Sequence, residues 1–273
     1  MNMAKQLIDK IEFTEEQRQI LYGALLGDGS LILHEHGKNA NFSYTSKSKQ
    51  HVEYVSNPFK KYWSSEGIKQ CTYYDSRTNK EYSRYAMRTY TNEVFTDERN
   101  KWYKNGTKII PKDLKLTPLM CKIWYIGDGG ICHSNRSEWI KLSTQCFSKE
   151  EQEEILLPQL SQFEATLMKA GVGKNQQRQY YIYIPHRKEK EFLDYIGECP
   201  FDDYLYKWRI SEYKNKVPKN HQSKEKEFCE MYLSGMTYYA IAKSFGIKPN
   251  AVKHYLIKNR LYKSNKNMEG EHG

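Results

Sequence analysis

The chain has 273 residues, a formal net charge of +10, a hydrophobic content of 38% and an aromatic content of 14%. This length predicts one large or two modest domains, and the aromatic content excludes a disordered protein. No run of the sequence approaches the roughly 18 apolar residues that span a bilayer, so we expect no membrane partner. The first residues lack the apolar core and cleavage site of a signal peptide, which predicts a cytoplasmic location.

The six cysteines are scattered without a C-x-x-C pair, which indicates reduced thiols. Two short pairs, His34 with His36 and Cys132 with His133, contain residue types that bind metals. Neither has a second pair at the spacing of a zinc site. We therefore interpret these residues as parts of strands and turns.

The first predicted element is an apolar helix over about residues 15–26, preceded by a capping box at Thr14 and Gln17. The helix ends in the sequence Gly-Asp-Gly, whose acidic residue is Asp28. An anion is disfavoured at a helix C-terminus, where unpaired carbonyls already carry partial negative charge. A single such motif would be interpreted as a helix stop.

The same motif recurs one hundred residues later. Thr117 and Pro118 begin a second apolar helix that we expect to run to Ile126, followed by Gly-Asp-Gly with Asp128. Each helix precedes the same predicted series of two strands, a helix, strands and a helix. In the first half these are strands 30–35, 41–47, 70–76 and 81–90 with helices 48–64 and 92–104, and in the second half strands 130–134, 138–147 and 179–185 with helices 149–170 and 187–197. This duplication predicts an α+β fold with pseudo-twofold symmetry.

Small residues allow the two Gly-Asp-Gly helices to pack closely on the pseudo-twofold axis. Gly23 and Gly27 lie on one face of the first helix, and Gly127 matches Gly27, although Ile123 replaces Gly23. Close packing would bring the two aspartates together and create a need for cations. Carboxylates that bind hard divalent metals together with substrate phosphates are typical of phosphodiester cleavage, so the pattern indicates a nuclease.

The stretches "LYGALLGDG" and "CKIWYIGDG" resemble the motif of the LAGLIDADG homing endonucleases, in the single-chain, two-repeat branch typified by the omega-intron enzyme. The resemblance covers about residues 12–200. It implies repeats over 12–112 and 113–213, which a basic linker over 214–222 would connect to a C-terminal module over 223–265.

The resemblance also implies the activity and its site. A monomer would place two antiparallel sheets as a saddle over double-stranded DNA and cut both strands of a long, asymmetric site, leaving short 3′ overhangs. Asp28 and Asp128, with Gly27 and Gly127, would form the Mg²⁺ site, in which Mn²⁺ could substitute. Lys108 stands where this branch has an active-site lysine, and its counterpart in the second half would be Gln179 or the neighbouring Arg178.

The predicted strands carry polar side chains at alternate positions, and these side chains could bind base edges or phosphates. An alternative for each residue is a solvated strand face. The candidates for DNA contacts are Asn41, Ser43, Thr45, Lys47, Arg84, Arg88, Lys141, Ser143, Gln145 and Arg178.

Residues 214–266 contain twelve Lys or Arg and three Asp or Glu, so they carry +9 of the net charge. Within them, residues 223–262 are predicted to form three short helices, the second capped by Thr237 and the third opened by Pro249. The pattern is typical of a helix-turn-helix module whose Asn250, Lys253 and His254 would face DNA. A small helical bundle with another partner is the alternative.

Two further functions compete with the endonuclease. The same fold also serves intron maturases, whose partner would be RNA, and the fold can lose its acids and act as a catalytically inactive DNA-binding regulator. The presence of both aspartates argues against the inactive regulator, and a maturase could also retain nuclease activity.

Overall fold

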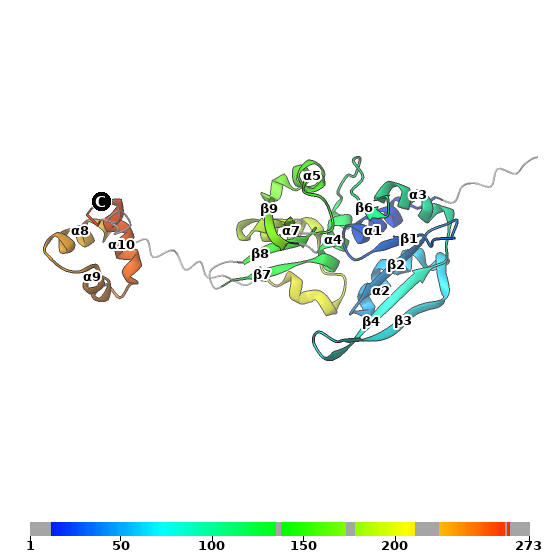
Figure 1. Ribbon diagram of the computed structural model, residues 1–273, viewed down its shortest axis with the longest axis horizontal. Coiled ribbons are helices and arrows are strands. Elements are labelled where there is room, and N and C mark those ends of the chain that lie inside the picture. The colour runs from blue at the N-terminus through cyan, green and yellow to red at the C-terminus, as the bar shows by residue number, and fades with distance from the viewer. Residues whose placement is uncertain (1–11, 135–137, 173–177, 211–223, 260, 263–273) are drawn as a thin grey trace, which may run out of the picture. The chain divides into compact units, whose positions relative to one another are not determined.

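Two four-stranded antiparallel sheets with the same strand order form the framework of the larger part of the chain (Figure 1). The computed structural model describes residues 12–134, 138–172, 178–210, 224–259 and 261–262. The chain divides into two units, residues 1–211 and 212–273. The predicted linker over 214–222 lies outside the described residues, and the boundary at residue 113 between the repeats stays a prediction.

The first half of the larger unit contains the sheet β1-β2-β4-β3. Its elements are α1 (Glu15–Leu26), β1 (Ser30–Ile32), β2 (Asn41–Ser46), α2 (Lys49–Ser56), the 3-10 helix η1 (Asn57–Tyr62), β3 (Trp63–Asp75), β4 (Lys80–Thr89), α3 (Glu93–Trp102) and the short hairpin β5 (Tyr103–Lys104) and β6 (Thr107–Lys108). The predicted capping box at Thr14 and Gln17 is present.

The second half repeats this order with the sheet β7-β8-β10-β9. Its elements are α4 (Pro118–Asp128), β7 (Gly129–His133), β8 (Glu138–Ser143), α5 (Lys149–Glu151), the π-helix η2 (Gln152–Leu156), α6 (Leu157–Gln159), the 3-10 helix η3 (Ser161–Phe163), β9 (Thr166–Val172), β10 (Arg178–Pro185), α7 (His186–Ile196) and the 3-10 helix η4 (Asp202–Trp208). The identical strand order confirms the predicted duplicated α+β fold.

Two predicted helices are too long. The helix predicted over 48–64 ends at Tyr62, and β3 begins at the next residue. The helical segment predicted over 149–170 ends at Phe163, because Glu164 adopts a left-handed conformation with φ of 52°. The chain then enters β9, whose Leu167 pairs with Ile182 of β10. Tertiary strand pairing therefore overrides the helical pattern at residues 166–170.

The inner face of each sheet packs on α1 and α4, which lie next to one another between the two sheets (Figure 1). The apolar residues alternate as the sequence predicts. Phe42, Tyr44 and Met87 are buried from the first sheet, and Ile140, Leu142, Ile182 and Ile184 are buried from the second.

The closest approach of α1 and α4 is at Gly23. A Cβ added there would lie 2.6 Å from the carbonyl oxygen of Met120 and 2.7 Å from Cβ of Ile123. These separations are shorter than van der Waals contact, so only glycine fits this position. Ile123, which departs from the glycine of the first motif, therefore fills the space that Gly23 leaves open.

The smaller unit contains α8 (Glu225–Leu233), α9 (Tyr238–Ser244) and α10 (Pro249–Lys258). Thr237 caps α9, and Pro249 lies in the first turn of α10, as predicted. The three helices share a core of Phe228, Ile241, Ala242, Val252 and Leu256. No helix in the described part of the chain is both long and apolar enough to cross a membrane.

Candidate active site

The two aspartates lie where α1 and α4 end side by side. Asp28 follows the capping residue Gly27, and Asp128 is the last residue of α4, which continues two residues beyond the predicted end. A Cβ added at Gly27 would lie 3.5 Å from Oδ2 of Asp128, and one added at Gly127 would lie 3.6 Å from Oδ2 of Asp28. Each carboxylate therefore faces the glycine of the opposite motif, an arrangement that brings the two helix ends together.

A lysine closes the carboxyl end of each motif helix. Lys108 Nζ, from β6, donates hydrogen bonds to the carbonyls of Leu25, Gly27 and Gly29 at 3.0, 3.2 and 2.8 Å. These contacts satisfy carbonyls that the end of a helix leaves unpaired and place a cation at the negative end of the helix dipole.

Lys207, on η4, makes the matching set of contacts at the second motif. Its Nζ donates to the carbonyls of Tyr125, Ile126 and Gly129 at 3.4, 2.6 and 2.7 Å. The side chain is buried, with 8% exposure. The pseudo-twofold axis thus relates Lys108 to Lys207.

The structure places Lys207, and not Gln179 or Arg178, at the position that corresponds to Lys108. Gln179 and Arg178 begin β10 and line a cavity of about 1,120 Å³ together with Lys108 and Cys146. The prediction aligned the strands of the two halves, whereas Lys207 lies on η4, after α7. A signal for Lys207 was nevertheless present, since Lys108 lies 79 residues beyond Gly29 and Lys207 lies 78 residues beyond Gly129.

Burial makes it costly for both aspartates to be charged. It raises the pKa of Asp28, and burial together with the neighbouring Asp28 raises the pKa of Asp128 to about 6. The nearby Lys108 and Lys207 act in the opposite direction on both groups. Burial also lowers the pKa of Lys207 to about 8. Two carboxylates whose charge is incompletely balanced form an oxygen-rich site suited to a hard divalent cation.

The side chains of Tyr44, His51 and Ser46 form a hydrogen-bonded chain beside Gly127. The hydroxyl of Tyr44 is 3.4 Å from the position that a Cβ of Gly127 would occupy. Tyr44 shares a hydrogen bond of 2.8 Å with Nε2 of His51, whose Nδ1 is 3.0 Å from Oγ of Ser46. Burial, and then the charge of Lys207, lowers the pKa of His51 to about 3, so the imidazole is neutral and joins the two hydroxyls.

The predicted DNA-contacting residues differ in accessibility. Asn41 and Ser43 are 4% and 8% exposed, because β2 is an inner strand in which Ser43 lies opposite Ser30 and Arg88. Burial therefore removes these two residues from the predicted DNA-contacting set. Residues that remain at least partly exposed are Thr45, Lys47, Arg84, Arg88, Lys141, Ser143, Gln145, Arg178, Asn250, Lys253 and His254.

Comparison with known proteins identifies the family of the larger unit. The model of the LAGLIDADG DNA endonuclease family matches residues 18–192. The chain therefore belongs to the LAGLIDADG DNA endonuclease family.

Individual relatives match this chain over different fractions of their own length. The DNA endonuclease I-ChuI of Chlamydomonas applanata is 28% identical over 218 residues, which are 72% of this chain and 96% of the relative. The cytochrome b mRNA maturase bI2 of Debaryomyces hansenii is 26% identical over 184 residues, or 62% and 64%. The chain spans 53% of an uncharacterized Methanocaldococcus jannaschii protein that is 29% identical over 140 residues.

A solved structure has the same fold. The homing endonuclease I-WcaI bound to its DNA recognition sequence has a TM-score of 0.64 and 21% sequence identity. The match covers 77% of this chain and 96% of that structure. The matching architecture agrees with the duplicated fold described above.

The neutral state of His51 predicts a specific dependence of stability on pH. Below pH 6.5 the unfolded chain protonates this histidine, whereas the folded chain does not until about pH 3. Its contribution to stability is therefore complete above pH 6.5 and is lost as the pH falls toward 3, with a slope of up to about 1.4 kcal/mol per pH unit. We expect His51→Gln to flatten the fall in unfolding free energy between pH 6.5 and 4.5, measured by urea denaturation.

The control for this measurement is His36→Gln, because His36 is exposed in the connection between β1 and β2. This variant should retain the pH dependence of the unmodified chain. Identical pH dependence in His51→Gln and the unmodified chain would mean that His51 titrates normally in the folded state.

Proposed function

We propose that the chain is a site-specific homing endonuclease that hydrolyses both strands of a long, asymmetric double-stranded DNA site and leaves short 3′ overhangs. The observation that carries the proposal is the pair of aspartates that face each other's glycines at the ends of α1 and α4. Family membership and the relative named as a DNA endonuclease support it.

We propose Asp28 and Asp128 as the ligands of divalent cations, with Mg²⁺ as the native ion and Mn²⁺ as a substitute. Bound there, such a cation supplies Lewis-acid stabilisation of the phosphate and activates water for attack. The two carboxylates fit this role because they lie close together and because the pKa of each is raised despite the nearby Lys108 and Lys207. Gly27 and Gly127 leave the space between the helix ends open, while the Gly27 carbonyl accepts a hydrogen bond from Lys108.

Lys108 and Lys207 hold the two helix ends in place and favour ionisation of the aspartates. All three N–H donors of each ammonium group are directed at backbone carbonyls. In this arrangement the lysines act on the reacting phosphate through their charge and through the position of the carboxylates. The neutral pair of Tyr44 and His51 closes one side of the site.

The smaller unit is proposed to be a helix-turn-helix module that adds contacts to DNA. Asn250 and His254 on α10 are exposed, and the segment 214–266 carries most of the net charge. Lys253 Nζ lies over the rings of Tyr238 and Tyr262, at 5.8 and 4.9 Å from their centroids. This packing fixes the stem of Lys253 at the surface of the unit.

An intron maturase is the second candidate, and the relative named as a cytochrome b mRNA maturase favours it. Assisting the folding of an RNA needs surface contacts and no pair of metal-binding carboxylates. The paired aspartates therefore favour the endonuclease, either alone or combined with maturase activity. The same carboxylates argue against a catalytically inactive DNA-binding regulator.

We expect Asp28→Asn and Asp128→Asn each to abolish double-strand cleavage with Mg²⁺ while leaving DNA binding largely intact, because each substitution removes a metal-binding charge without changing shape. The substrate is a DNA in which the sequences flanking the reading frame are rejoined without it. Cleavage is followed on gels, and sequencing of the product ends tests for short 3′ overhangs. Full cleavage by either variant would exclude that aspartate from the site, and a maturase would retain its splicing assistance in both.

We expect Lys108→Met and Lys207→Met to slow single-turnover cleavage by about 10²-fold and to change binding much less. Loss of either cation also makes the aspartates harder to ionise, so the acidic limb of the pH–rate profile should move to higher pH. Lys190→Met is the control, because Lys190 is exposed on α7 and pairs with Asp194. An unchanged rate in Lys207→Met, with a slowed rate in Gln179→Ala, would restore Gln179 as the counterpart of Lys108.

Deleting residues 214–273 should leave a folded unit that binds DNA more weakly and with less dependence on salt. Each lost phosphate contact lowers the slope of log K against log[salt] by about 0.9. A variant with Lys243→Gln and Lys248→Gln, both exposed, should give a smaller change of the same kind. Equal affinity and salt slope in the deleted and full-length chains would mean that the smaller unit has another partner.

A further inference from the structure

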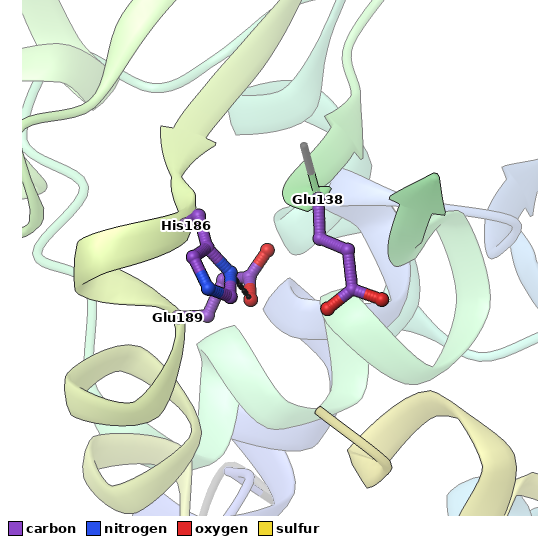
Figure 2. A group of neighbouring side chains, drawn as sticks. All are labelled: Glu138, His186 and Glu189. Carbon is purple, nitrogen blue, oxygen red and sulfur yellow. Dashed lines mark hydrogen bonds and ion pairs between the residues drawn. The ribbon is translucent and has the colours of Figure 1, made fainter. Parts of the chain in front are cut away.

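A second group of metal-binding residue types lies in the second half, away from the paired aspartates. Figure 2 shows Glu138 at the start of β8 beside His186 and Glu189 in the first turn of α7. One ligand atom from each residue lies within 4.8 Å of the others. His133, the last residue of β7, contacts the same group, with its Nδ1 2.6 Å from Oε1 of Glu138.

This group is distinct from the proposed active site. Asp128 precedes β7, whereas His133 ends it, and four residues of strand span about 13 Å. The inference therefore does not depend on the proposed endonuclease function.

Both carboxylates of this group are buried, and one oxygen of Glu189 lacks a partner. Glu138 is 1% exposed and Glu189 is 0% exposed. Oε2 of Glu189 is 2.8 Å from Nδ1 of His186, while Oε1 is inaccessible to solvent and has no hydrogen-bond partner among the described residues. A buried carboxylate oxygen without a partner is costly. In Figure 2 the Glu189 carboxylate lies between the imidazole of His186 and the side chain of Glu138.

We propose that Glu138, His186 and Glu189 bind a Zn²⁺ ion, with His133 as the fourth ligand. Imidazole nitrogens combined with carboxylate oxygens suit Zn²⁺, which takes four such ligands, better than they suit Mg²⁺. On binding, the proton between His186 Nδ1 and Glu189 Oε2 and the proton between His133 Nδ1 and Glu138 Oε1 both leave to solvent, each imidazole keeps its other proton on Nε2, and the freed nitrogen and oxygen atoms bind the metal. Charge then balances, because two carboxylates meet one divalent cation and two neutral imidazoles.

The sequence showed only part of this site. His133 has no second pair at zinc spacing near it in the sequence, because Glu138 follows five residues later but His186 and Glu189 follow only after 53 and 56 residues. The fold supplies the missing pair, because β8 is flanked by β7 and β10, and α7 follows β10 directly. The ion would tie the β7–β8 hairpin, which carries Lys141, to the start of α7. We therefore assign it a structural role.

The test uses the full-length chain with Asp28→Asn and Asp128→Asn, so that the paired-aspartate site does not bind the probe. After removal of metals with a chelator, Zn²⁺ alone is titrated by calorimetry, and metal content is measured after gel filtration. We expect one Zn²⁺ per chain, no displacement by excess Mg²⁺, and a melting temperature that rises with Zn²⁺. Co²⁺ in place of Zn²⁺ should give the visible absorption of a four-coordinate site.

In this background Glu189→Gln should weaken Zn²⁺ binding by about 100-fold and abolish the rise in melting temperature, and His186→Ala should do the same. Glu189→Gln preserves side-chain shape, so it remains informative if His186→Ala does not fold. The matched control is Glu191→Gln on the same helix, whose exposed carboxylate pairs with Lys188. A parent protein that retains no Zn²⁺, or equal binding in Glu189→Gln and Glu191→Gln, would overturn the proposal.

Discussion

The contact between α1 and α4 at Gly23 is the constraint on which the rest of the larger unit depends. Any side chain at this position would overlap the backbone at Met120. Because glycine has none, the two helices approach closely enough for their carboxyl ends to meet. This approach places two carboxylates at the negative ends of two helix dipoles, which is an unfavourable arrangement without compensation. The two sheets pack against this helix pair, and their strands follow the pseudo-twofold symmetry that it defines.

The lysines at the helix ends partly compensate for this arrangement. Lys108 and Lys207 bind the carbonyls at the helix ends and also favour the charged form of both aspartates. Burial and the neighbouring Asp28 outweigh these cations at Asp128, whose pKa rises to about 6. The lysines do not fully balance the negative charge of the two carboxylates. A divalent cation would balance the remainder and could also bind a substrate phosphate.

The sequence predicted the elements whose signals are local. Capping residues such as Thr14 and Thr117 predicted the starts of α1 and α4, and alternation of apolar and polar residues predicted strands such as β2. It failed where tertiary pairing overrides local pattern, as at residues 166–170 of β9, which were predicted to be helical. Lys207 was missed because η4 has no regular pattern to align between the halves, and the burial of Asn41 and Ser43 depends on their neighbours in the sheet.

The fit of Ile123 against Gly23 also has a consequence for how the two halves assemble. Two copies of the second half would bring isoleucine against isoleucine and collide, because even a Cβ at position 23 would lie 2.7 Å from Cβ of Ile123. The second half is thus a poor partner for a copy of itself and fits the glycine of the first half. The two repeats are therefore not interchangeable at this contact, although they share one fold.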